Sequence, residues 1–207
     1  MPTDVTPLFH GELASLRRLV QKQRQQVQTI VVAYGWPASQ AVVPIASGMP
    51  LVISKGVGVA LARVAGSELA AGMVSKAVEL LRPVGGSGHE GYFHLERTAA
   101  LLQMLDDIQS SAVADVRCFF ALSKGDGQPS VVLGGEVSDL LKVLLFVCAR
   151  LFSESPSSRA DVLATIKTAS HGRLAGEVWS LGTFATNAGC QQGATLPRSP
   201  KTKTSPR

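Results

Sequence analysis

The sequence predicts a mainly helical protein: a single compact domain of about five helices that ends in a disordered basic tail. Apolar residues recur at helical spacing in several long segments, and 207 residues are enough to bury a core without a disulfide or a metal. The tail is predicted because prolines mix with polar and basic residues there and no apolar pattern recurs. We expect a flexible N-terminus at 1–11, the helical domain at 12–192 and the tail at 193–207.

The first helix is expected from Glu12 to Val32. Positions 13, 16, 20, 23, 27 and 30 alternate steps of three and four residues, which places them on one face of a helix. They hold Leu13, Leu16, Val20, Val27 and Ile30, with Gln23 as the only polar member. This face lasts less than three heptads, so it fits two arrangements: a helix docked on its own domain, or a helix that pairs with another chain.

Residues 25–54 carry no charged side chain. Pro37, Pro44 and Pro50 exclude a continuous helix through this segment. Its β-branched pieces at 29–32, 42–43 and 51–53 could instead pair as small strands or pack as extended loops. The segment is therefore expected to be a buried connector, or alternatively a surface that contacts a membrane or a partner protein.

A second helix is expected from Lys55 to Leu81, because Pro83 follows it. Small residues recur every four positions along this helix, and such a ridge lets another helix approach closely. They are Gly58, Ala62, Gly66 and Ala70. Together with the apolar face of the first helix, this ridge is a candidate self-association surface.

Three further helices are expected in the second part of the chain. One runs from His94 to Val116. Residues 116–122 either extend this helix or pair with residues 130–133 in a small β-hairpin around a glycine-rich turn. The other two, from Ser138 to Phe152 and from Ser158 to Ala169, begin with residues that cap helix N-termini. No internal repeat is apparent in the sequence.

The net charge of +5 is concentrated at the two ends of the chain. Removing the four cations of the tail leaves +1 for residues 1–192, and the first helix carries a second basic group. The two groups are Arg17, Arg18, Lys22 and Arg24, and Arg198, Lys201, Lys203 and Arg207. Each cation could neutralise a phosphate of a nucleic acid, or serve only as solvated surface. Because only 5% of residues are aromatic, we expect backbone contact without sequence preference.

Signals for catalysis or metal binding are weak. Gly56 and Gly58 match a dinucleotide-binding loop only in part, because Leu61 stands where a third small residue is needed. His89 and His94 lack the i, i+4 spacing of a zinc-binding pair on one helix. No cofactor and no metal are therefore expected, and an enzyme is the least favoured class.

The cysteines indicate a reducing compartment. Cys118, Cys148 and Cys190 are odd in number and far apart, and two of them lie in apolar runs. The sequence also lacks a secretory signal and an uninterrupted apolar run of membrane-spanning length. We therefore expect an intracellular, cytoplasmic location.

These observations favour a non-enzymatic structural or assembly protein. Charged residues make up only 17% of the chain, which leaves uncharged surface for self-association into a homo-oligomer. The basic ends would contact the backbone of RNA or DNA, as in a coat-like or nucleocapsid-like subunit. The alternative is a peripheral membrane or regulatory adaptor that binds a protein partner through the uncharged segment 25–54.

Overall fold

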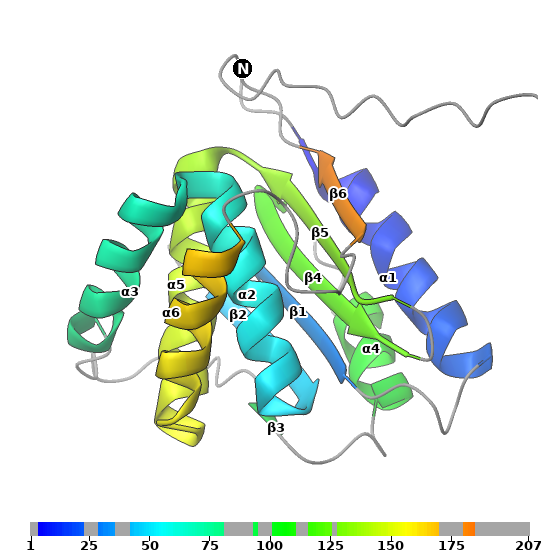
Figure 1. Ribbon diagram of the computed structural model, residues 1–207. Coiled ribbons are helices and arrows are strands. Elements are labelled where there is room, and N and C mark those ends of the chain that lie inside the picture. The colour runs from blue at the N-terminus through cyan, green and yellow to red at the C-terminus, as the bar shows by residue number, and fades with distance from the viewer. Residues whose placement is uncertain are drawn as a thin grey trace, which may run out of the picture.

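The computed structural model describes residues 4–22, 29–35, 42–80, 93–94, 101–110, 116–125, 128–169 and 180–184. In this part of the chain, six helices lie on the two faces of a six-stranded sheet, so the molecule has three layers (Figure 1). The mainly helical class is confirmed, but the sheet is larger than the expected hairpin. The predicted tail at 193–207 lies outside the described residues.

The sheet has an antiparallel centre and two parallel outer pairs. Its strands in chain order are β1 (Thr29–Gly35), β2 (Val42–Gly48), β3 (Phe93–His94), β4 (Cys118–Lys124), β5 (Ser130–Gly135) and β6 (Ser180–Phe184). Their order across the sheet is β3-β2-β1-β4-β5-β6. The four central strands pair antiparallel, while β3 pairs parallel with β2 and β6 pairs parallel with β5.

The helices divide unequally between the two faces of the sheet (Figure 1). Helices α1 (Thr6–Lys22) and α4 (Leu101–Ser110) share one core with Ile30, Val32 and Phe119. Helices α2 (Pro50–Ala65), α3 (Ser67–Leu80), α5 (Val137–Glu154) and α6 (Ser158–Thr168) share the other core, with Val31 and Ala33. Alternate β1 residues enter opposite cores because successive side chains of a strand point to opposite faces. Among the described residues, no helix is both long and apolar enough to cross a membrane.

The first helix ends earlier than the sequence predicts. Helix α1 covers Thr6–Lys22, and Ile30 lies in β1 rather than on a helical face. All seven residues of β1 are buried, and its β-branched side chains suit a strand covered on both faces. The lack of charge in this part of segment 25–54 therefore follows from its position at the centre of the sheet. Val27 lies outside the described residues.

The expected helix from Lys55 to Leu81 is divided in two by Gly66. Helix α2 begins earlier, with Pro50 in its first turn, where the missing N–H of proline has no cost. It ends at Gly66, whose φ of 77° belongs to the left-handed region that glycine adopts without strain. Helix α3 then starts at Ser67 and runs in a new direction.

The second half of the chain agrees more closely with expectation. Strands β4 and β5 form the hairpin that the sequence offered as one of two alternatives. Helices α5 and α6 lie within one or two residues of the predicted limits. Helix α4 is described at Leu101–Ser110, and His94, the expected start of this helix, is in β3.

The chain contains an internal repeat that the sequence does not reveal. Each half runs helix, strand, strand, helix, helix, strand, so that α1 to β3 are repeated by α4 to β6. The sheet order is unchanged when the halves are exchanged, and Val32 pairs with Ala121, its own equivalent in β4. The two halves are therefore related by an approximate two-fold axis that passes between β1 and β4.

The register within each hairpin supports this equivalence. Thr29 pairs with Gly48 in the first half, as Cys118 pairs with Gly135 in the second. Gly48 and Gly135 have φ values of 128° and 120°, and each directly precedes the residue that caps the next helix. When the two halves of the sequence are aligned at these glycines, the residues of α2 and α5 correspond one to one without a gap.

Candidate polyanion interface

The basic side chains predicted on the first helix are mostly engaged within the chain. Arg17 Nη2 lies 3.1 Å from Asp106 Oδ1, an ion pair that joins α1 to α4. Arg18 Nε donates to the carbonyl oxygen of Ala14 at 3.3 Å, one turn earlier in the same helix. Lys22 is exposed at the end of α1. Arg24 and the tail cations Arg198, Lys201, Lys203 and Arg207 lie outside the described residues.

Acidic residues balance the cations on this side of the molecule. Besides Asp106, helix α4 carries Asp107, which accepts a hydrogen bond from Gln103 Nε2 at 2.8 Å. Helix α1 carries Glu12, and burial raises the pKa of this carboxyl above its usual value. The cations of α1 and α4 therefore do not outnumber the acids, and this face is a poor phosphate-binding surface.

The apolar face of α1 is part of the core of its own chain. Leu13, Leu16 and Val20 are at most 5% exposed, and they pack in the core that α1 forms with α4 and the sheet. Of the two arrangements left open by the sequence, the structure contains the helix docked on its own domain. These three side chains are not accessible to a second copy of the chain in this fold.

The small-residue ridge also acts within the chain. A Cβ atom at Gly58 would lie 2.7 Å from Thr165 Cβ, so the absence of a side chain there lets α6 pack closely on α2. Ala70 is buried, Ala62 is half-buried and Gly66 is exposed at the end of α2. The expected close approach of helices is thus found between α2 and α6 of one chain.

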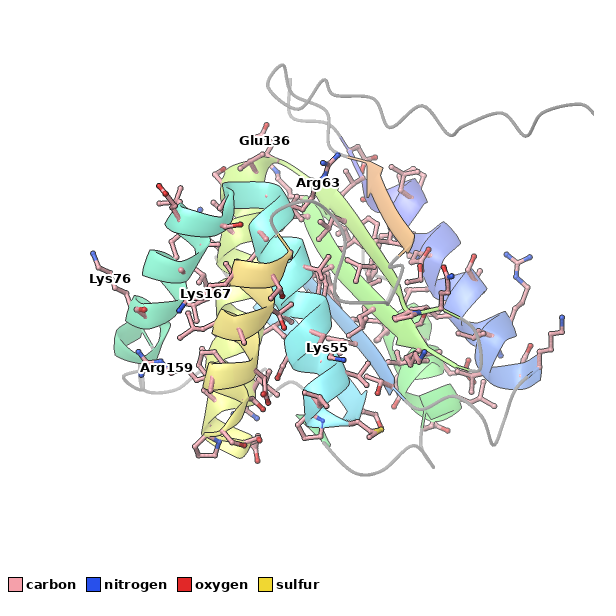
Figure 2. The ribbon with its side chains drawn as sticks, in the orientation of Figure 1. Lys55, Arg63, Lys76, Glu136, Arg159 and Lys167 are labelled. Carbon is pink, nitrogen blue, oxygen red and sulfur yellow. The ribbon has the colours of Figure 1, made fainter. Side chains whose placement is uncertain are left out.

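A different set of cations lies on the outer helices. Figure 2 shows Lys76 of α3 and Arg159 and Lys167 of α6 on the side of the molecule away from α1, whereas Arg63 of α2 points toward β5 and β6. Lys76 and Lys167 are exposed and make no ion pair or hydrogen bond within the described residues. Arg159 Nη2 donates to the carbonyl oxygen of Ser75 at 3.1 Å, which brings the start of α6 close to Lys76. We call Lys76, Arg159 and Lys167 the outer basic face.

Charge on these helices is unbalanced in favour of cations. Helices α2, α3 and α6 contain the cations Lys55, Arg63, Lys76, Arg159 and Lys167 and the acids Glu68, Glu79 and Asp161. Glu136, which caps α5, is a further acid on this side (Figure 2). Cations that are held apart and exposed attract a polyanion more strongly than cations that are paired with carboxylates. The outer basic face is therefore the better candidate for contact with an anionic polymer.

The outer basic face was missed because its members come from two helices and never cluster in the sequence. The packing of α6 on α3, where Arg159 donates to Ser75, brings these cations to the same surface. No local run of basic residues in the sequence signals them.

The structure gives no support to the weak catalytic signals. Gly56 and Gly58 lie in the buried middle of α2, where backbone N–H groups bond within the helix and cannot bind a phosphate. Within the described residues, no group of three or more His, Cys, Asp or Glu side chains could hold a metal ion. His89 lies outside the described residues.

Cys118 and Cys148 are free and buried, as the sequence predicts. Burial raises the pKa of the Cys118 thiol to about 12, and the nearby carboxylate of Asp139 acts in the same direction. Burial also raises the pKa of the Cys148 thiol. Both thiols therefore stay protonated at neutral pH, which makes them poor nucleophiles.

No protein-family model, no curated protein and no solved structure matches the chain. The function must therefore be argued from the fold and from the charges on its surface.

Proposed function

We propose that the protein is a non-enzymatic structural or assembly protein that self-associates and contacts the backbone of RNA or DNA. The observation that carries the proposal is the outer basic face, whose cations Lys76 and Lys167 have no partner within the described residues. The basic tail adds four cations and no acid to the same chain. A subunit of this kind would neutralise phosphates without reading bases, as coat-like proteins do.

The uncharged segment 25–54 does not favour the adaptor alternative. Its described residues form β1, β2 and the start of α2, and β1 is buried throughout. Of the exposed large apolar side chains in the described residues, Met49 and Leu51 belong to this segment. Two neighbouring side chains make a small patch compared with the surface that a stable interface buries.

We expect self-association of the purified chain at micromolar concentrations. Among the described residues, the exposed large apolar side chains are Leu8, Met49, Leu51, Leu69, Val137 and Phe146. Burying such side chains between copies would remove apolar area from water. Light scattering checks the prediction, and a mass that stays near 21.7 kDa at every concentration would contradict it.

We expect the chain to bind single-stranded RNA with an affinity that falls steeply as salt rises. Each phosphate neutralised on a single strand contributes about 0.7 to the slope of log affinity against log salt concentration. Removing residues 193–207 deletes Arg198, Lys201, Lys203 and Arg207, so the slope should decrease by up to about 3. The measurement is a salt titration by fluorescence anisotropy with a labelled RNA of about 20 nucleotides. Absence of binding by the full chain at low salt would remove nucleic acid from the proposal.

A further inference from the structure

The two edges of the sheet are formed by β3 and β6, which are equivalent strands of the internal repeat (Figure 1). On its side of the sheet β6 is the last described strand, and among the described elements it makes extensive contact only with β5. The outer side of an edge strand presents backbone N–H and C=O groups, and such an edge accepts a strand of another chain unless something blocks it. The two edges differ in the features that block pairing.

The edge at β3 carries such features. Only two described residues, Phe93–His94, pair with β2. Glu90 lies three residues before this strand, and Glu96 and Arg97 follow within three residues of its end. Short edge strands and nearby charge are two ways in which proteins protect a sheet edge. This edge is therefore a poor site for the addition of a strand.

The edge at β6 lacks both features. All five residues of Ser180–Phe184 pair with β5. The sequence contains no charged residue and no proline from Val178 to Leu196, so neither device interrupts this edge. Gly182 stands at the middle of the strand, and a glycine there often marks a place where another backbone approaches closely. The strand β6 is thus a template for a further strand.

We infer that the chain self-associates by pairing β6 with β6 of a second copy, antiparallel about a two-fold axis. This inference rests on the proposed function and assigns its self-association to one sheet edge. A two-fold arrangement that pairs all five residues places Ser180 opposite Phe184 of the second copy, with Gly182 on the axis. A charged residue near this axis would lie close to its own copy and repel it, and β6 contains none. The sheets of the two copies then continue into one another.

An uncharged edge suits an identical strand better than a segment of another protein. Selection of a foreign segment commonly depends on complementary charge or on repulsion of the wrong partners. Residues 178–196 supply neither. An identical strand needs no such selection, because one pairing satisfies the outward backbone groups of both edges.

The test replaces adjacent residues of β6 by proline in the full chain, as Leu181→Pro and Gly182→Pro. Successive N–H groups of a strand point to opposite sides, so one of the two variants removes only an outward N–H and keeps its melting temperature. That variant should weaken self-association about tenfold or more, since the two-fold axis removes one donor from each copy. His94→Pro at the other edge is the matched control and should stay within about twofold of the unmodified chain. Sedimentation equilibrium measures the association, and thermal melting checks folding.

Hydrogen–deuterium exchange of the unmodified chain tests the same pairing without a substitution. Amides of Ser180–Phe184 should exchange about tenfold more slowly at a protein concentration where the chain self-associates than in a dilute sample. This measurement decides the question if both proline variants fail to fold.

The outcomes separate the inference from the proposed function. If the chain self-associates while the folded proline variant associates as tightly as the unmodified chain, the assignment to β6 is wrong and the proposed function stands. Unchanged exchange of the β6 amides on self-association overturns the assignment in the same way. A single-chain mass at every concentration contradicts both the inference and the proposed self-association.

Discussion

Replacing Gly135 by alanine is expected to lower the free energy of unfolding by about 3 kcal/mol or more. Its φ of 120° is a backbone conformation that residues with a side chain rarely adopt, and holding alanine there costs about 1 to 3 kcal/mol. A Cβ atom would also lie 2.5 Å from the carbonyl oxygen of Arg117. Arg117 cannot move away freely because its N–H donates to Gly35 at 3.1 Å. Urea denaturation measures the change.

Two other glycines provide the controls for this prediction. Gly48 is the equivalent of Gly135 and has a φ of 128°, so alanine there should also be destabilising. Gly72 lies inside α3, and a Cβ atom at this position would meet no other atom within 4 Å. Alanine at Gly72 should therefore stabilise the protein by about 0.5 to 1 kcal/mol. Unchanged stability of Gly135→Ala would contradict the strand-to-helix geometry of the second half.

The thiol of Cys118 is expected to react about a thousandfold more slowly in the native protein than an accessible thiol. Only the thiolate is nucleophilic, and a pKa of about 12 lowers its fraction at pH 8 about a thousandfold relative to the ordinary value of 9.0. Cys148 is expected to be protected too, because burial raises its pKa as well. The native rate for Cys118 should rise about tenfold for each pH unit.

Alkylation with iodoacetamide, followed by mass spectrometry of the peptides, measures each cysteine separately. Peptides that contain Cys118 and Cys148 should remain unlabelled in the native protein and become labelled in urea. Cys190 lies outside the described residues, and its peptide is read independently. Rapid labelling of native Cys118 would show that the space between β4 and the start of α5 is open to solvent.

The sequence predicted elements correctly where the apolar pattern had a single interpretation. Helix α5 is apolar around most of its circumference, and α6 begins and ends near its expected limits. The helix prediction was wrong at 29–32, because Ile30 happens to continue the helical spacing of α1. Residues 29–35 form a strand that is buried on both faces of the sheet, and a local sequence pattern does not show this burial.

The repeat could not be found from the sequence for a related physical reason. Buried positions of α2 and α5 require apolar side chains of suitable total volume, and different residues satisfy this requirement. Val57 corresponds to Leu144, and Leu61 to Cys148. Only Gly48 with Gly135, Ala62 with Ala149, Lys55 with Lys142 and Arg63 with Arg150 remain identical, and they are too few to be recognised without the fold. The outer basic face was hidden in the same way, since tertiary packing assembles it.

The most direct test of the central claim is to map bound RNA on the folded chain by nuclear magnetic resonance. Amide shifts recorded with and without the RNA should change along α6 and around Ser75 in α3, near Lys76, Arg159 and Lys167. Amides of α1 around Arg17 should not move, because Asp106 pairs with this residue. Shifts confined to α1 would contradict the assignment of phosphate binding to the outer basic face.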